Sequence, residues 1–109
     1  MKKEGTRFMR ILVFFDLPTE TAENRHNAAK FRNNLIKDGY YMLQYSVYCR
    51  ICRGMDSSEK HIRRLMMRTP MEGNIRVLEI TEKQYERMKI ILGKKQLAEQ
   101  IDSRQLVFF

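Results

Sequence analysis

The feature that most constrains this chain is a run of five large apolar residues, Ile11 to Phe15, which ends on an acid, Asp16. The run does not alternate between apolar and polar residues, so it predicts a β-strand that is buried on both faces. In a two-layer α+β domain the helices cover only one face of the sheet. The other face needs a cover of its own, and the simplest one is a second copy of the same sheet in a homodimer.

Two helices are expected on the first face. A loop follows the strand, and Thr19 or Thr21 can cap a helix that runs to about residue 38. A second helix follows Gly54, where residues 56–59 (DSSE) resemble a capping box with Asp56 as the cap. The apolar stripes of the two helices are Ala28, Phe31 and Leu35 in the first, and Ile62, Leu65 and Met66 in the second.

The remaining segments are mostly strand-like. Residues 41–53 alternate and predict one long strand, and residues 74–80 predict a third strand. Residues 81–92 fit either one helix from Thr81 or a short turn followed by a strand at 88–92 (MKIIL). A polar connector leads to the apolar tail QLVFF at residues 105–109, and pairing with a partner chain would protect such a strand from aggregation.

Size and charge limit the class of protein. With 109 residues the chain is expected to form one domain, and 21 Lys and Arg against 13 Asp and Glu give a net charge of +8. This surplus favours polyanionic partners such as nucleic acid. The apolar run is shorter than the about 7–15 residues of a signal-peptide core, and no segment approaches the roughly 18–20 apolar residues of a membrane span. We therefore expect a cytoplasmic protein without a membrane partner.

The two cysteines, Cys49 and Cys52, are expected to be buried, reduced thiols. They lie three positions apart on a predicted strand, so their side chains point to opposite faces. A redox pair would instead begin a helix, and a zinc site would have to recruit His26 and His61 from distant elements. Both histidines are expected on the surface of the helices, with no nucleophile at a diagnostic spacing.

Asp16 is the candidate for chemistry. At the end of a sheet strand its carboxylate could hold Mg²⁺, which is usually bound by one or two carboxylates together with water and phosphate oxygens. The alternative is that Asp16 accepts backbone N–H groups at the start of the first helix. A two-fold axis that brings Asp16 of two chains together would favour the metal site.

Basic residues gather in the segment 50–68 and predict a surface that binds phosphates. On the second helix they form a stripe opposite the apolar stripe, and a merely solvated helix face is the alternative. No base-reading motif is visible, so we expect contacts with the nucleic-acid backbone that are independent of sequence. The candidate residues are Arg50, Arg53, Lys60, Arg63, Arg64 and Arg68.

The order of several features resembles the CRISPR-associated protein 2 family, the small subunit of the complex that inserts new spacers into CRISPR arrays. These features are an apolar strand ending on Asp16, Arg25 in the next helix, Gly39, and the run QYSVYC at residues 44–49. The combination looks especially like members that accompany type II systems. The resemblance spans about residues 9–109.

The resemblance implies a ferredoxin-like α+β sandwich over residues 1–109, with residues 1–8 as a flexible extension and residues 93–109 as a connector and a dimer-pairing strand. The homodimer would pack through the open faces of its sheets. Residues 88–92 would form the fourth strand after a short turn, and residues 105–109 would pair with the partner's sheet. The hairpin that the fold requires would lie among the later strands or within the long second strand, residues 41–53. Many members have Tyr before the strand-ending acid, whereas Phe15 stands here and offers no hydroxyl.

Two functions are compatible with this resemblance. In the first, the chain is a Mg²⁺-dependent (or Mn²⁺-dependent) endonuclease on RNA or DNA, with Asp16 of both chains as the metal ligand. In the second, it is a catalytically silent scaffold of the spacer-acquisition complex that binds double-stranded DNA and bridges integrase subunits, and the acid is dispensable. Metal dependence discriminates between them, because Arg and Lys bind phosphate without Mg²⁺.

Overall fold

The computed structural model describes residues 8–95 of the chain. Residues 1–7 and 96–109, and with them the predicted terminal strand at 105–109, lie outside the described part. The elements in chain order are β1 (Phe8–Asp16), α1 (Ala22–Lys37), β2 (Tyr41–Gln44), β3 (Val47–Arg53), α2 (Met55–Met66), β4 (Asn74–Thr81) and α3 (Glu82–Glu86).

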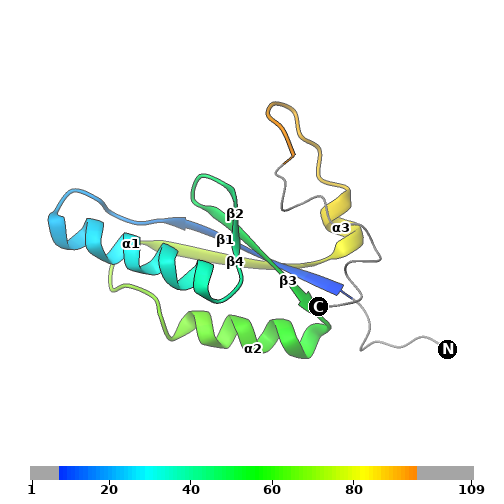
Figure 1. The fold of residues 1–109 in the computed structure, drawn as a ribbon, viewed down its shortest axis with the longest axis horizontal. Coiled ribbons are helices and arrows are strands. Elements are labelled where there is room, and N and C mark those ends of the chain that lie inside the picture. The colour runs from blue at the N-terminus through cyan, green and yellow to red at the C-terminus, as the bar shows by residue number, and fades with distance from the viewer. Residues whose placement is uncertain (1–7, 96–109) are drawn as a thin grey trace.

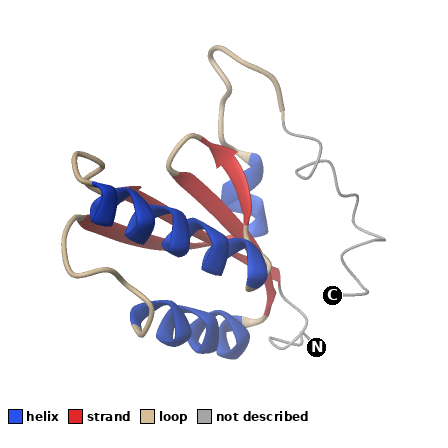
Figure 2. Ribbon diagram, turned by 60° about the vertical axis from the view of Figure 1, so that its left-hand side comes forward, coloured by secondary structure: helices blue, strands red, loops and turns tan. Residues whose placement is uncertain are grey.

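The four strands form one antiparallel sheet in the order β2-β3-β1-β4. Helices α1 and α2 lie together on one face of this sheet, as Figure 1 shows, and α3 lies on the other side, behind the strands in Figure 2. The order β-α-β-β-α-β up to β4 is that of a ferredoxin-like fold. The predicted α+β class and two-layer arrangement are confirmed for the described residues.

The prediction of a single strand over residues 41–53 is wrong. The chain turns back at Tyr45 and Ser46, so that β2 and β3 form a hairpin with Met42 opposite Tyr48 and Gln44 opposite Val47. The register shifts between these two pairs, and Ser46 has a positive φ of 65°. The alternation of apolar residues continues through the turn, and for this reason the sequence pattern did not reveal the turn. This hairpin supplies the additional strand that completes the ferredoxin-like order.

The apolar run of strand β1 is buried on both faces as its sequence predicted, except at Phe14, which is exposed. Met9, Ile11, Val13 and Phe15 pack in the core beneath α1 and α2. The opposite face of the sheet, called the far face below, carries the alternate residues of β1 and is partly covered by Tyr85 of α3. This cover by α3 was not predicted. Farther along the far face Phe14 stays 38% exposed and Leu78 of β4 51% exposed, so this part of the face has no cover among residues 8–95.

The helices confirm some of the predicted signals and correct others. Thr21 caps α1, since its side chain accepts a hydrogen bond of 3.0 Å from the N–H of Asn24. Asp56 as the cap of α2 is wrong, because that helix begins at Met55 with Gly54 at the N-cap position and without a side-chain cap bond. The predicted burial of Met66 is also wrong, because this side chain is 68% exposed. The core residues of the two helices are Ala28, Phe31 and Leu35 in α1 and Leu65 in α2, with Ile62 packed against them.

Both interpretations of residues 81–92 need correction. A helix does begin after Thr81, in a capping box with Gln84, but it ends at Glu86. Residues 88–92 are not a strand, so the fourth strand of the sheet is β4 and not the segment MKIIL. Within residues 8–95 no helix has the length and apolar character that crossing a membrane requires.

Candidate metal and nucleic-acid site

Asp16 lies at the last position of β1 with its side chain exposed. Its partner across the ladder is Asn74 of β4, and the preceding pair on the same face is Phe14 with Arg76. Because side chains alternate along a strand, all four belong to the far face. A shallow depression of about 250 Å³ opens there, lined by Phe14, Phe15, Asp16, Ser46, Val47, Asn74 and Arg76.

The alternative that Asp16 caps the first helix is wrong, since Thr21 is the N-cap of α1. The Asp16 carboxylate makes no hydrogen bond or ion pair to any residue between 8 and 95. The backbone of Asp16 is tightly packed, however. A Cβ placed on Gly73, which has a φ of +118°, would lie 2.6 Å from Leu17 Cδ2 and 3.0 Å from the Asp16 carbonyl oxygen. Gly73 therefore lets the α2–β4 loop press directly against the end of β1.

The donor set around Asp16 fits one or two ligand positions of a hydrated Mg²⁺. Among residues 8–95 no group of three or more His, Cys, Asp and Glu side chains is arranged to hold a metal ion. Asn74 could add an amide oxygen beside the carboxylate, which suits a hard cation that keeps several waters. A complete site needs further oxygen ligands, either from a substrate phosphate or from a second Asp16.

Three of the six predicted phosphate-binding residues are exposed on or just after α2: Lys60, Arg63 and Arg68. Arg53 is exposed at the end of β3. Their binding of phosphate stays a prediction. The structure places these four cations where a polyanion could reach them.

Arg50 and Arg64 are instead bound to the protein itself. Arg50 donates from Nε to the Asp38 carbonyl oxygen at 2.6 Å and from Nη1 to the Ile51 carbonyl oxygen at 2.9 Å. Arg64 Nε lies 3.4 Å from Asp38 Oδ1, and Arg64 Nη2 lies 3.1 Å from His61 Nδ1. These contacts join the end of α1 to β3 and α2. Both guanidinium groups therefore have a structural task besides any contact with nucleic acid.

His61 corrects the prediction that both histidines are surface residues. His26 is exposed as predicted, but His61 is only 6% exposed and its Nδ1 lies 3.4 Å from Asp38 Oδ2. Burial and the nearby Arg50 lower the pKa of His61 below its ordinary value, although Asp38 acts in the other direction. Nδ1 faces both the Arg64 guanidinium, which can only donate, and the Asp38 carboxylate, which can only accept, so the tautomer of the ring decides which of the two it hydrogen-bonds.

The cysteines are as predicted. Cys49 and Cys52 are free and buried, and they belong to the clusters on opposite faces of the sheet. Burial raises the pKa of both thiols, so each stays protonated and unreactive near neutral pH.

A buried ionic cluster on the far face was not predicted. Arg10, only 1% exposed, donates from Nε and Nη2 to the Glu82 carboxylate at 2.7 and 2.9 Å, and from Nη1 to the Tyr41 hydroxyl at 2.6 Å. Its guanidinium carbon also lies 3.8 Å from the centre of the Tyr85 ring. The cluster fastens α3 to the sheet. The sequence contains one signal of the cluster. Arg10 lies two positions before the buried Leu12 on β1, so both side chains point to the same face of the sheet.

Comparison with known proteins gives a consistent result. Residues 9–88 match the family model described as CRISPR associated protein Cas2. The chain is 51% identical over 87 residues to the "CRISPR-associated endoribonuclease Cas2" of Campylobacter jejuni, a match that covers 80% of this chain and 61% of that protein. Proteins with the same name from Acidovorax ebreus and Flavobacterium psychrophilum are 44% and 43% identical, over 93% and 94% of this chain and 100% and 90% of theirs.

Proposed function

Because this chain belongs to the CRISPR-associated protein Cas2 family, we propose that it is a homodimeric, Mg²⁺-dependent endonuclease that cleaves RNA or DNA at a site built from Asp16 of both chains. The observation that carries the proposal is Asp16 itself. It is an exposed carboxylate at the end of a buried strand, with no partner between residues 8 and 95 and beside a depression on the far face. The relatives' names support cleavage of nucleic acid.

A homodimer through the far face would bring the two Asp16 side chains together. Phe14 and Leu78 leave apolar surface exposed on this face, and Asp16 lies at the end of the same surface. A two-fold axis through it makes an interface of identical patches. Two converging carboxylates repel each other, and a cation between them relieves that repulsion.

Each residue of the site then has a defined task. When bound, Mg²⁺ would polarise a phosphodiester and lower the pKa of a coordinated water. The paired Asp16 carboxylates would hold the ion, and the Asn74 amide beside each could orient a coordinated water. Arg76 is exposed on the same face and would attract the negatively charged phosphate.

The test is cleavage of single-stranded RNA and duplex DNA by the wild type and by Asp16→Asn, each with Mg²⁺ or with a chelator. Asn keeps the shape and one acceptor oxygen but removes the charge. We expect Asp16→Asn to lose cleavage while its thermal melt and sedimentation match the wild type. Glu20→Gln, which removes an exposed carboxylate from the neighbouring loop, is the matched control and should cleave normally. Equal cleavage by Asp16→Asn and wild type would refute the proposed site.

The dimer has a separate test. Leu78→Lys places a charge on the exposed part of the far face. The control Ile36→Lys places the same charge on α1, at a position of similar exposure, since Ile36 is 56% and Leu78 51% exposed. Sedimentation at micromolar concentration should show dissociation of the Leu78 variant alone. A wild-type chain that sediments as a monomer would remove the basis for a shared site.

A second candidate function rests on the exposed cations of α2. Lys60, Arg63 and Arg68 would bind the backbone of double-stranded DNA, and the chain would serve as a scaffold of the spacer-acquisition complex beside integrase subunits. If a dimer neutralises about four to six phosphates, log K should fall with log[salt] at a slope of roughly −4 to −5. Arg63→Ala and Arg68→Ala should weaken binding and flatten this slope, without any need for Mg²⁺. Salt-independent binding would contradict the scaffold.

A further inference from the structure

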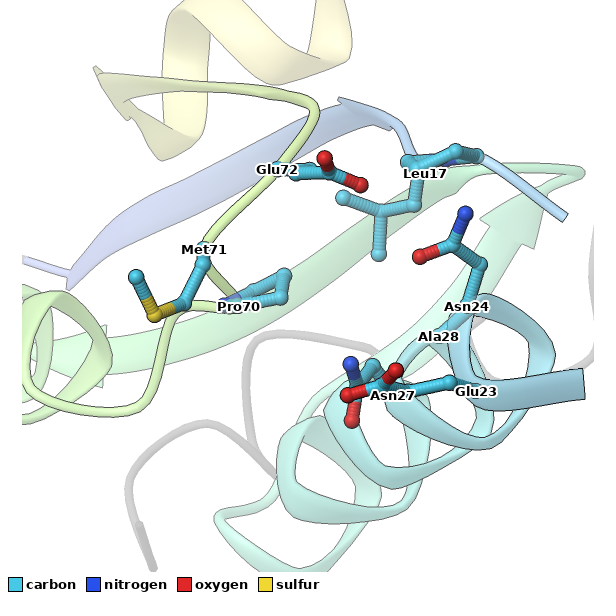
Figure 3. A pocket seen from close by; sticks show the side chains of 9 residues that line it. Leu17, Glu23, Asn24, Asn27, Ala28, Pro70, Met71 and Glu72 are labelled. Carbon is cyan, nitrogen blue, oxygen red and sulfur yellow. The ribbon is translucent and has the colours of Figure 1, made fainter. Parts of the chain in front are cut away.

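A pocket of about 260 Å³ lies between α1 and the loop that joins α2 to β4. Figure 3 shows the side chains of α1 on one side and those of the loop on the other, with Leu17 across from Glu72 at the top of the view. None of its residues takes part in the proposed nuclease site. The lining consists of Leu17, Pro18, Glu23, Asn24, Asn27, Ala28, Pro70, Met71 and Glu72.

The charge of this pocket is opposite to that of the chain. Its lining contains two carboxylates, Glu23 and Glu72, and no Lys or Arg, in a protein whose net charge is +8. The amides of Asn24 and Asn27 offer further acceptor oxygens beside the apolar surface of Leu17. Phosphates would be repelled here. A Lys or Arg side chain fits instead, because its aliphatic stem can lie on apolar atoms while its head reaches the carboxylates.

The wall of the pocket includes an exposed methionine. Met71 is 98% exposed there, and two more exposed methionines, Met66 at 68% and Met67 at 84%, precede the same loop at the end of α2. Flexible, polarisable methionine side chains adapt to varied apolar partners, and they commonly line surfaces that bind amphipathic segments. An acidic pocket with an exposed methionine in its wall favours a ligand that is both basic and apolar.

We propose that this pocket, with Met71 in its wall, forms a docking site for a basic, amphipathic segment of a protein partner, with one Lys or Arg side chain between Glu23 and Glu72. The site lies in the layer of α1 and α2, so it stays accessible when the far face pairs in a dimer. It also adjoins the nuclease site through the backbone, since Gly73, next to Glu72, packs against Leu17 and the carbonyl group of Asp16. A docked partner would therefore sit beside the end of β1 without competing with nucleic acid for cations.

The test uses the full chain and a synthetic probe. The probe is an amphipathic Leu/Lys peptide of about four helical turns, compared with a Leu/Glu peptide of the same pattern. Binding is followed by fluorescence anisotropy, and the contact surface is mapped by amide NMR shifts. We expect the Leu/Lys peptide alone to bind and to shift residues of the pocket, Met71 among them.

The variant Glu23→Gln/Glu72→Gln should weaken this binding about two- to tenfold, the range for two partly exposed ion pairs. The control Glu59→Gln/Glu86→Gln changes the net charge equally at exposed positions outside the pocket and should bind like wild type. Met71→Ser should weaken binding without changing the charge. If the acid variant proves unfolded by circular dichroism, Glu72→Gln alone, in the loop, replaces it.

The proposal is overturned if the Leu/Glu peptide binds equally well, if both acid variants lose the same affinity, or if an RNA hairpin or DNA duplex shifts the pocket residues. Cleavage by the Glu23→Gln/Glu72→Gln variant should equal that of wild type. Failure of the docking site and failure of the nuclease proposal are thus separate results.

Discussion

Removing Glu82 should destabilise the fold strongly, because it would leave the Arg10 guanidinium buried without its carboxylate. Arg10 is 1% exposed and makes two short hydrogen bonds to Glu82. Burial acts against the charged form of Arg10, but the Glu82 carboxylate and Tyr41 outweigh it, so the pKa of Arg10 lies above its ordinary value. Arg10 cannot escape by losing its proton. The variant Glu82→Ala therefore leaves the buried positive charge of Arg10 without its carboxylate partner.

The size of the effect follows from the surroundings. Breaking a buried ion pair from one side costs roughly 3–5 kcal/mol. The Glu82 side chain is still 18% exposed, and Arg10 would keep its contacts with the Tyr41 hydroxyl and the Tyr85 ring. We therefore expect the free energy of unfolding to fall by about 2–3 kcal/mol, at or just below the lower limit of that range. Because α3 is short and rests on this cluster, it should separate from the sheet.

The assay is urea unfolding at a fixed protein concentration, since dimerisation would otherwise alter the apparent stability. Glu86→Ala, at an exposed position of the same helix, is the control and should stay within about 0.5 kcal/mol of wild type. The double variant Arg10→Met/Glu82→Leu removes both charges and should be more stable than Glu82→Ala alone. If Glu82→Ala loses less than about 0.5 kcal/mol, Arg10 is hydrated and the argument from burial fails.

Two further predictions concern the helix layer and the end of β1. The pKa of His61 is lowered in the folded protein. Its neutral ring should therefore stabilise the fold fully above the unfolded pKa of about 6.5, and this contribution should be lost as pH falls through the folded pKa. In unfolding measured against pH, His61→Gln should flatten this dependence and His26→Gln should leave it unchanged. Gly73→Ala should lower the free energy of unfolding by about 1–3 kcal/mol, through both its positive φ and the clash with Leu17. In parallel melts Gly93→Ala, with a similar φ of +116° and nothing within 4 Å, should lose less, and equal losses would show that the clash is absent.

Much of the fold could be predicted from the sequence, but the β2–β3 turn could not, because it carries no strong turn signal. Strand β1 and helix α1 have strong signals, namely an unbroken apolar run and a Thr cap before an apolar stripe. The β2–β3 turn contains Tyr45 and Ser46, and neither residue is glycine, proline or asparagine. Ser46 takes its positive φ in the turn that pairs β2 with β3, and β3 is held on its other side by β1, which is a tertiary effect. Pattern alone could not separate this hairpin from one long strand.

The face that α2 turns to the core was harder to predict, because two of its buried residues are polar. Ser58 and His61 are buried beside Leu65, whereas the apolar Met66 points to solvent. Burial of these polar groups is tolerated because each has a partner: Ser58 donates to the Glu79 carboxylate, and His61 contacts Asp38 and Arg64. Partners so distant in the sequence cannot be recognised from the spacing of apolar residues.

The same long-range partners decide which positive charges can meet a nucleic acid. Counting residues in the segment 50–68 treats all cations alike, but Arg50 and Arg64 already serve carbonyl and carboxylate oxygens near the end of α1. Releasing either one to a phosphate would break contacts that join α1, β3 and α2, so nucleic acid should first engage the exposed cations of α2.

Asp16 differs from these cations in what the sequence could show. Its place at the end of a strand was readable from the sequence, whereas its position on the far face beside Asn74 and Arg76 depends on the register of β4. Charge that the fold leaves without a partner, rather than charge in total, is therefore what locates the candidate sites.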